Sequence, residues 1–511
     1  MNALLLYPTF PKTFWSFERV IRLEGRKTML PPLGLVTVAA LLPQAWSFKL
    51  VDCNVRPVTE EEWGWADLVL LSGMIVQKPA LLALVAEAKE RGKPVAVGGP
   101  YASACPEELS AAGADYLVLD EGEVTIPPFV AALARGEPGG LFRAGGERAD
   151  ITTSPVPRFD LLELDAYYSL AVQFSRGCPY ACEFCDIIVM HGRRPRTKTP
   201  AQLLTELDAL YTLGWRRPVF LVDDNFIGNK RRVKALLARL EPWQRARHYP
   251  FIFTTEASIN LAEEEALMRM MVDSHFKNVF IGFETPDTAS LALTGKVQNM
   301  RAPMVESAHR ITRAGLRIMA GFIIGFDGEA PGAGQRIVEF MRASSIPIGM
   351  FSTLQALPHT ALWQRLEREG RLTAGDATVN QTSLPNFIPT RPMEAIAEEY
   401  VEAFWAIYDP IAYLDRTYHH YAMMGPPRHQ ARTDRKGWKV YRALALLLLR
   451  QGVIGPTRWR FWGYLWRIKR NNPAVLIGYL KACAYYEHFA EYREVVRREI
   501  QAQLAVRSDA A

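Results

Sequence analysis

Short apolar runs alternate with helix-length stretches along most of this chain, and that alternation constrains the fold more than any other feature. In the first 145 residues the apolar runs are 3–7, 48–52, 68–72, 95–98 and 116–119. Helical patterns such as 33–42 and 80–91 lie between them. Strands that alternate with helices pair in parallel, because each helix returns the chain to the same end of the sheet. Residues 1–145 are therefore predicted to form a doubly wound, Rossmann-like α/β domain.

A second series of the same kind follows a Gly- and Pro-bearing stretch at about 136–157 and a predicted linker, 146–169. Its candidate strands are 172–175, 219–223, 251–255, 279–283, 318–324 and 350–354. Six βα units in a row are typical of a parallel barrel. Residues 170–390 are thus predicted to form a partial (β/α)6 barrel of the TIM type. The strand signal then ends, and residues 391–511 are predicted to form an α-helical C-terminal domain.

Three cysteines, Cys178, Cys182 and Cys185, stand within eight positions just after the first predicted barrel strand. Six cysteines in 511 residues are too few for a disulfide framework, and this crowding is typical of thiolates that bind metal in a reduced compartment. Three thiolates on one loop can bind three irons of a [4Fe–4S] cluster and leave the fourth iron open. The open iron can chelate S-adenosylmethionine, which an electron from the cluster then cleaves to a 5′-deoxyadenosyl radical. The alternative is a structural zinc site, which needs a fourth ligand such as His191.

The Cys-x3-Cys-x2-Cys spacing at the end of a barrel strand resembles the radical S-adenosylmethionine (SAM) superfamily. The resemblance implies cofactor-binding roles for residues that follow the other strands. The methionyl amine is assigned to Asp223, Asp224 and Asn225, the ribose to Glu284, and the adenine to the segment with Gly321, Ile323 and Gly325. Glu256 and Lys296 are weaker candidates on the same face. Each carboxylate has an ordinary alternative as a solvated loop residue or helix cap, but barrel active sites are built where these residues stand.

Small-residue turns follow three strands of the N-terminal domain, at the edge where open α/β sheets bind ligands. They are Ser72-Gly73-Met74, Gly98-Gly99-Pro100 and Glu121-Gly122-Glu123. Such a domain before a radical SAM barrel resembles the cobalamin-binding subgroup of the superfamily. The chain lacks an Asp-x-His-x-x-Gly motif, and its first histidine is His191. We therefore expect the lower face of the cobalt to meet an apolar or weakly ligating wall, with Met74 and Tyr101 nearby. The alternative is a degenerate domain that only supports the barrel.

The strings at 192–200 and 222–229, together with a helical C-terminal extension, are similar to a branch that methylates hopanoids and bacteriochlorophyll precursors. This resemblance implies a cobalamin-dependent C-methyltransferase that acts on an unactivated carbon of a large apolar substrate, of isoprenoid or tetrapyrrole type. Methylcobalamin would donate the methyl group, and a second SAM would regenerate it. One rival is a radical SAM cyclase or ring-rearranging enzyme without net methyl transfer. A non-catalytic cobalamin or redox sensor is the other.

Charge and aromatic patterns suggest partners. The Arg/Lys-rich stretch 193–198 has three interpretations: a solvated loop, a surface that steers an electron donor such as flavodoxin or ferredoxin, or a site that holds a substrate phosphate. Trp459, Trp462 and Trp466 alternate with basic residues, which is typical of a membrane interface or of a packed helical cap whose arginines stay in water. No nucleic-acid-binding motif accompanies the net charge of +6.

No stretch approaches the roughly twenty apolar residues of a spanning helix. The apolar N-terminus lacks the flanks of a signal peptide. We therefore expect a cytoplasmic protein that is at most peripheral to the membrane. Residues 379–387 are a predicted substrate lid.

Overall fold

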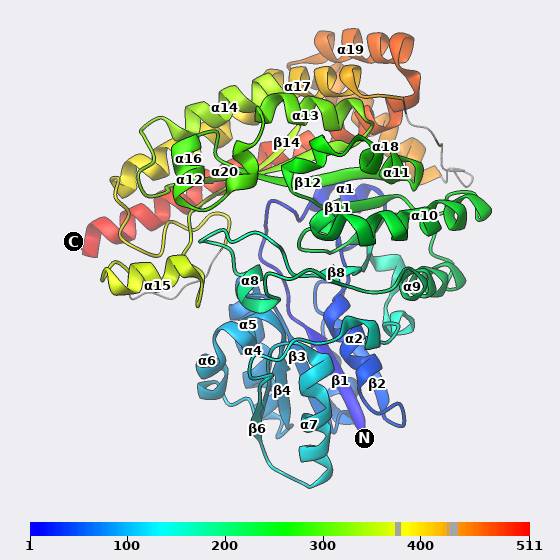
Figure 1. The fold of residues 1–511 in the computed structure, drawn as a ribbon, viewed down its shortest axis with the longest axis vertical. Helices are drawn as coiled ribbons and strands as arrows, with labels where there is room; N and C mark the ends of the chain where they lie inside the picture. The colour runs from blue at the N-terminus through cyan, green and yellow to red at the C-terminus, as the bar shows by residue number, and fades with distance from the viewer. Residues whose placement is uncertain (374–379, 427–428, 430–437, 511) are drawn as a thin grey trace.

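The computed structural model describes residues 1–373, 380–426, 429 and 438–510. Two six-stranded parallel sheets form the framework, one in the N-terminal part and one in the barrel (Figure 1). The predicted fold class is confirmed. The predicted domain boundaries at 145, 170 and 390 each fall between elements of the structure, and they remain predictions.

The N-terminal sheet has the strand order β2-β1-β3-β4-β5-β6. Its strands are β1 (Asn2–Tyr7), β2 (Ser47–Asp52), β3 (Leu68–Ser72), β4 (Val95–Gly98), β5 (Tyr116–Val118) and β6 (Gly140–Phe142). All five predicted strands are present. The sixth, β6, was not predicted, because an edge strand of three residues that begins with glycine and exposes Leu141 carries no apolar pattern.

Helices cover both faces of this sheet, as a doubly wound fold requires. Side chains of α2 (Leu33–Leu41) and α7 (Gly122–Ala134) share one core with Leu5 of β1. Those of α3 (Glu60–Trp65), α4 (Lys78–Glu90), α5 (Gly99–Ala104) and α6 (Pro106–Ala111) share another with Leu4 and Leu6. Alternate residues of a strand point to opposite faces, so the apolar run of β1 supplies both cores.

The barrel sheet has the order β14-β13-β12-β11-β10-β7 and stays open between its edge strands, which makes it a partial barrel. Its strands are β7 (Leu170–Val172), β10 (Val219–Leu221), β11 (Phe253–Glu256), β12 (Phe276–Glu284), β13 (Arg317–Ile324) and β14 (Ile348–Thr353). The helices between them include α9 (Pro200–Thr212), α10 (Lys230–Ala246), α11 (Glu265–Asp273), α12 (Thr288–Leu293), α13 (Met304–Arg313) and α14 (Ala333–Ser344), followed by α15 (Ala361–Arg368).

The first barrel strand differs from its prediction at 172–175. The sheet strand β7 ends at Val172, and β8 (Ser175–Arg176) pairs instead with β9 (Arg196–Thr197) in an antiparallel ribbon. The Phe174 N–H and the Ser175 hydroxyl donate to the Asp223 carboxylate, at 2.7 and 2.6 Å. These bonds replace sheet bonds and direct the chain off the barrel.

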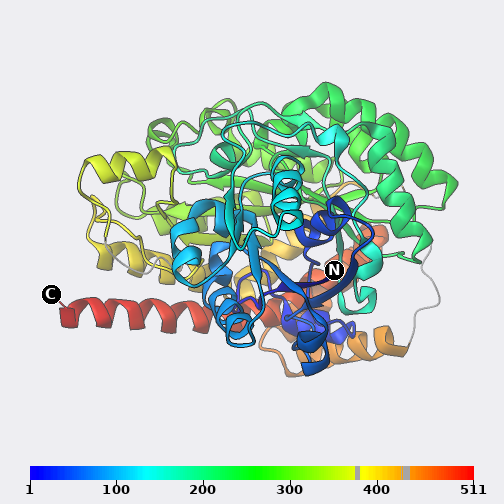
Figure 2. The ribbon, with the colours of Figure 1, turned by 90° about the horizontal axis from the view of Figure 1, so that it is seen from below.

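The C-terminal helices pack against the barrel and against a strap formed by residues 8–17. They are α16 (Met393–Ile407), α17 (Pro410–Met423), α18 (Trp438–Leu449), α19 (Arg458–Asn471) and α20 (Leu476–Ala510). The Phe14 ring of the strap stacks on Phe489 of α20 at 4.9 Å and contacts Phe404 of α16. The far end of α20 projects beyond the body (Figure 2). Within the described residues, no helix is long and apolar enough to cross a bilayer.

Candidate cofactor site

The loop that carries the three cysteines is anchored at its first residue. Gly177 has a left-handed backbone, with φ +94°, and its N–H donates to Asp224 at 2.7 Å. A Cβ on Gly177 would lie 2.9 Å from the carbonyl oxygen of Gly192, so a larger residue does not fit. The Cys178 N–H donates to that same carbonyl at 3.3 Å. These contacts hold the backbone on the N-terminal side of Cys178.

The cysteine side chains lie beside amide donors. The Asn225 side-chain nitrogen is 3.8 Å from the sulfur of Cys178, and that of Gln298 is 3.9 Å from the sulfur of Cys182. Burial raises the pKa of Cys182, against the attraction of Lys296, and raises the pKa of Cys185 to about 12. Cluster binding must therefore displace protons from these thiols. Hydrogen-bond donors at the sulfurs suit an iron–sulfur cluster, so the residues present fit that group.

No three His, Cys, Asp or Glu side chains within the described ranges are grouped as ligands of one metal ion. His191, the fourth ligand in the zinc alternative, has its Nδ1 3.6 Å from a carboxylate oxygen of Glu121. The cluster role of the three cysteines stays a prediction based on their spacing and their loop.

The predicted carboxylates gather at the carboxyl ends of the barrel strands. Asp223 is buried, and burial raises its pKa to about 7 despite the bonds from Ser175 and Phe174. Burial, with the charges of Asp224 and Asp223, raises the pKa of Glu256 to about 8. A cation bound among these carboxyl groups would favour their charged forms. Asp223 accepts a hydrogen bond on each oxygen, from Phe174 and Ser175, and Asp224 accepts one from Gly177. The role of these carboxyl groups at the methionyl amine stays a prediction.

Glu284 ends β12 in a left-handed conformation, with φ 62°, which is rare for a residue with a side chain. Its buried carboxylate pairs with the Lys296 ammonium. Asn299 donates to the carbonyl groups of Gly282 and Phe283 at 3.1 and 2.9 Å and holds the end of the strand. Gln298 and Asn299 were not predicted as site residues. The only signal for them in the sequence is that they follow Lys296 by two and three positions.

The predicted adenine segment lies on β13. A Cβ on Gly321 would come within 2.8 Å of the Phe280 ring. Ile323 packs in one cluster with Phe184 of the cysteine loop. Gly325 has φ +99°, and its N–H donates to Glu329 at 2.8 Å. The structure therefore brings the middle of this segment next to the loop.

In the N-terminal domain the first two predicted turns interlock. A Cβ on Gly99, where φ is +86°, would lie 2.2 Å from the Ser72 hydroxyl oxygen, and one on Gly98 would lie 2.7 Å from the Val118 carbonyl. Of the two predicted neighbours of cobalt, Met74 is exposed. Tyr101 is buried in the domain core, and its hydroxyl donates to Glu108. The interlocked glycines leave a bare backbone at the ligand edge, which suits a large cofactor such as cobalamin.

The third turn differs from the first two. Glu121 and Glu123 are buried beneath the barrel's loops, where they pair with Arg176 and Arg196. The sequence assigned both glutamates to cobalamin. The structure shows them engaged with the ribbon that carries the cysteine loop.

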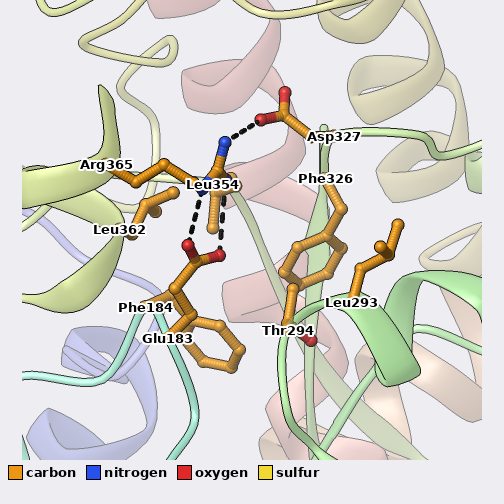
Figure 3. A pocket seen from close by; sticks show the side chains of 9 residues that line it. All are labelled: Glu183, Phe184, Leu293, Thr294, Phe326, Asp327, Leu354, Leu362 and Arg365. Atoms are coloured by element: carbon orange, nitrogen blue, oxygen red, sulfur yellow. Dashed lines mark hydrogen bonds and ion pairs between the residues drawn. The ribbon is translucent and has the colours of Figure 1, made fainter. Parts of the chain in front are cut away.

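A cavity of about 290 Å³ adjoins the cysteine loop (Figure 3). Its walls come from that loop, from the ends of β13 and β14, and from α12 and α15, and they include Phe184, Phe326 and Leu354. Arg365 of α15 joins Glu183 of the loop, at 2.6 Å, to Asp327 after β13, at 2.8 Å. The contact pins the second half of the loop to the barrel. No sequence pattern marks this contact, because 182 residues separate Glu183 from Arg365.

The predicted lid is held in place where the structure describes it. Val379 lies outside the described residues. The Gln381 carbonyl accepts a hydrogen bond from the Tyr400 hydroxyl, and the Ser383 carbonyl accepts one from Thr353 of β14. These contacts tie residues 380–387 to the barrel and to α16.

Comparison with known proteins identifies the family. Family models match residues 20–130 (B12 binding domain), 172–341 (Radical SAM superfamily) and 360–502 (a domain of unknown function). The chain is 58% identical to an uncharacterized methyltransferase of Synechocystis sp., over 99% of this chain and 94% of that protein. It is 34% identical to the hopanoid C-2 methylase of Rhodopseudomonas palustris, over 91% of this chain and 89% of that one. The chain belongs to the cobalamin-dependent radical SAM methyltransferases.

Solved structures share the fold of this methyltransferase. The radical SAM methyltransferase TsrM from Kitasatospora setae, solved with cobalamin and a [4Fe–4S] cluster, matches with a TM-score of 0.61. The match covers 80% of this chain and 91% of TsrM at 15% identity. The expected family, fold class and cofactor set of the methyltransferase are therefore confirmed. The individual cofactor-binding residues remain predictions.

Proposed function

We propose that this methyltransferase adds a methyl group to an unactivated carbon of a large apolar substrate of isoprenoid type, and specifically of a hopanoid. The observation that carries the proposal is the 34% identity to a hopanoid C-2 methylase over nearly the whole chain. The match covers 91% of this chain and 89% of the hopanoid methylase, so it extends into the C-terminal helices.

The inner face of the barrel sheet supports an apolar substrate. Phe283 packs outward on Phe340 of α14, so Phe280, three residues earlier, faces inward. Phe280 is only half-buried, and so are Met319 and Met350 on the neighbouring strands. Trp15 of the strap contacts both Phe280, at 5.6 Å between rings, and the Met350 sulfur, at 3.2 Å. Aromatic and thioether side chains form the kind of wall that binds an apolar ring system.

When bound, the cofactors supply a radical that removes hydrogen from carbon and a methyl group that replaces it. The chain supplies position. Cys178, Cys182 and Cys185 hold the cluster, Asp224 and Glu256 bind the methionyl amine, and the turns at Ser72 and Gly99 hold cobalamin. The apolar wall keeps water from the reacting carbon.

The substrate proposal is tested in a hopanoid-producing bacterium that lacks its own C-2 methylase. Cells that express this chain should make hopanoids one methyl group heavier, detected by mass spectrometry. Cells that express a variant with alanine at Cys178, Cys182 and Cys185 should not. Rearranged hopanoids without added carbon would favour the cyclase alternative, and an unchanged hopanoid profile would exclude hopanoids as the substrate.

An acidic electron carrier of the flavodoxin or ferredoxin type is the proposed donor. Four arginines are exposed, namely Arg193, Arg194, Arg231 and Arg232, and none has an ion-pair partner among the described residues. The last two follow Gly228, where an added Cβ would lie 3.4 Å from Pro179 of the cysteine loop. The backbone of Arg194 lies beside the residue that precedes Cys178, because a Cβ on Gly177 would be 3.1 Å from the Arg194 carbonyl oxygen. The four arginines are called the arginine patch, and the patch thus adjoins the cysteine loop. Arg231 and Arg232 start α10, where the helix dipole disfavours cations, so helix stability does not explain them.

Exchange of Arg193 and Arg194 for glutamate should slow reduction of the cluster by flavodoxin by about tenfold at low salt, because attraction between unlike charges steers such encounters. Reduction by dithionite, which needs no docking, is the control and should not change. Equal rates with flavodoxin for both proteins would remove this patch as the docking surface.

A peripheral membrane contact through α19 is also proposed. Phe461 and Ile468 form its packed face, whereas Trp459 and Trp466 are 78% and 59% exposed and cannot be the buried face of a cap. Val453 and Ile454 extend the exposed apolar surface just before the helix. Exposed tryptophan beside basic residues suits the headgroup layer, and each basic residue near an anionic surface contributes about 1 kcal/mol.

Serine at Trp459, Trp462 and Trp466 should weaken sedimentation with phosphatidylglycerol vesicles by about tenfold or more, because the rings no longer enter the interface. The matched control places serine at Leu141, Leu213 and Ile388, which are exposed apolar residues outside this surface. Equal binding of both variants would contradict the membrane contact.

A further inference from the structure

Four charged side chains are buried together where the N-terminal domain meets the barrel. Glu121 and Glu123 stand at the start of α7, at the carboxyl edge of the N-terminal sheet. Arg176 lies 3.3 Å from Glu121 and 2.9 Å from Glu123. Arg196 contacts both oxygens of Glu121, at 2.7 and 2.9 Å. The carboxylate side chains are only 2% and 6% exposed.

The cluster makes further hydrogen bonds to neighbouring groups. Glu121 accepts the N–H of Ala149 at 2.7 Å, and Glu123 accepts the hydroxyl of Ser154. Arg196 donates to the carbonyl of Ala149 at 2.6 Å. The two carboxylates face the two guanidinium groups, and the Nδ1 of His191 lies 3.6 Å from Glu121. Pairing with opposite charges is the condition under which buried ions are tolerated.

The arginines connect this cluster to the cysteine loop. Arg176 is two residues before Cys178, and it pairs across the β8–β9 ribbon with Arg196. The Gly177 N–H next to it is held by Asp224 of the barrel. One continuous chain of contacts thus runs from the edge of the N-terminal sheet, through the ribbon, to the predicted cluster ligands.

Such a cluster adds little to the stability of the fold, because the free energy lost when four charges leave water is about as large as the free energy gained when they pair. Buried ions instead fix one arrangement of the parts that they join, since any other arrangement leaves a charge unpaired. Domains in one chain move relative to each other by default when their interface is polar. A buried ion cluster at this interface opposes that motion.

We propose that Glu121, Glu123, Arg176 and Arg196 are positioning residues that hold the cobalamin-binding domain at one fixed distance from the cluster loop. The methyl donor and the radical source belong to different domains and must reach the same carbon, so their separation has to be set by the protein. The inference rests on the cofactor placement in the proposed function and is independent of which substrate is methylated.

The test is the distribution of distances between cob(II)alamin and the reduced cluster, measured by pulsed electron paramagnetic resonance without substrate. The wild type should give one narrow distribution. The double variant Glu121→Gln, Glu123→Gln should give one about twofold wider, or shifted, because the arginines lose their charged partners. An unchanged distribution in a variant that binds both cofactors would overturn the proposal.

The matched control is Glu60→Gln with Glu87→Gln, which removes both partners of Arg91 on the surface of the same domain. It should leave the distribution narrow. If the double variant fails to bind both cofactors, the same distance measurement is made on Arg176→Met and Arg176→Lys instead. The methionine variant should widen the distribution and the lysine variant, which keeps the charge, should restore most of its sharpness; equal distributions for the two would overturn the proposal. Because no substrate is present, the outcome is separate from that of the hopanoid experiment.

Discussion

Alanine at Cys178, Cys182 and Cys185 together is expected to abolish the iron–sulfur absorbance of the anaerobically reconstituted protein. Formation of 5′-deoxyadenosine from SAM should disappear with it. The three sulfurs are the ligands expected for three irons of the cluster, and the amides of Asn225 and Gln298 cannot replace thiolates as ligands. Iron content, visible absorbance and 5′-deoxyadenosine are measured on the same preparation.

The matched control is alanine at the other three cysteines, Cys53, Cys105 and Cys483. All three are free in the structure and lie outside the loop. This control should keep about four irons per chain. Retention of that iron content by the loop variant would show that the cluster is bound elsewhere.

Alanine at Gly99 is expected to lower cobalamin binding by about tenfold or more, with iron content unchanged, because the ligand edge must shift. The new Cβ would lie 2.2 Å from the Ser72 hydroxyl oxygen, so the turn 72–74 and the turn 98–100 can no longer interlock. The measurement is bound cobalamin per chain, by absorbance, after reconstitution and gel filtration.

Gly92→Ala is the control for this substitution. Gly92 lies in the same domain with φ +66°, but nothing lies within 4 Å of its added Cβ. It therefore carries a comparable backbone strain without the clash, and it should keep cobalamin. Equal cobalamin loss in both variants would indicate general destabilisation, and full binding by Gly99→Ala would contradict a role of this turn at the cofactor.

The sequence predicted the two sheets well because buried parallel strands are continuous apolar runs. The prediction of strand bounds was wrong where the end of a strand depends on residues far away in the sequence. The chain leaves the barrel after Val172 because of Asp223, which is 49 residues from Phe174. The strand β6 was missed because Leu141 is exposed and an edge strand needs no apolar pattern.

The candidate site was predictable to the extent that parallel strands place their carboxyl ends together. That rule grouped Asp224, Glu256 and Glu284 correctly at one edge of the barrel. It also grouped Glu121 and Glu123 with the ligand edge of their own domain, but could not show that they face the barrel. Their partner Arg176 is 53 residues or more away, and ion pairs at that separation leave no periodic trace.

The packing of the strap could not be predicted from the sequence either. His488 of α20 contacts the carbonyl of Phe14 across 474 residues, and neither residue belongs to a motif. The strap places Trp15 against the inner wall of the barrel, so part of the proposed substrate wall comes from a segment that the sequence left unassigned.

Transfer of a methyl group to carbon by radical chemistry can be measured directly. A direct test uses purified protein, reconstituted with cluster and cobalamin, together with flavodoxin as reductant, methyl-deuterated SAM and a hopanoid. We expect a hopanoid that carries the deuterated methyl group, together with equal amounts of 5′-deoxyadenosine and S-adenosylhomocysteine. Formation of 5′-deoxyadenosine with a hopanoid product of unchanged mass would contradict this expectation.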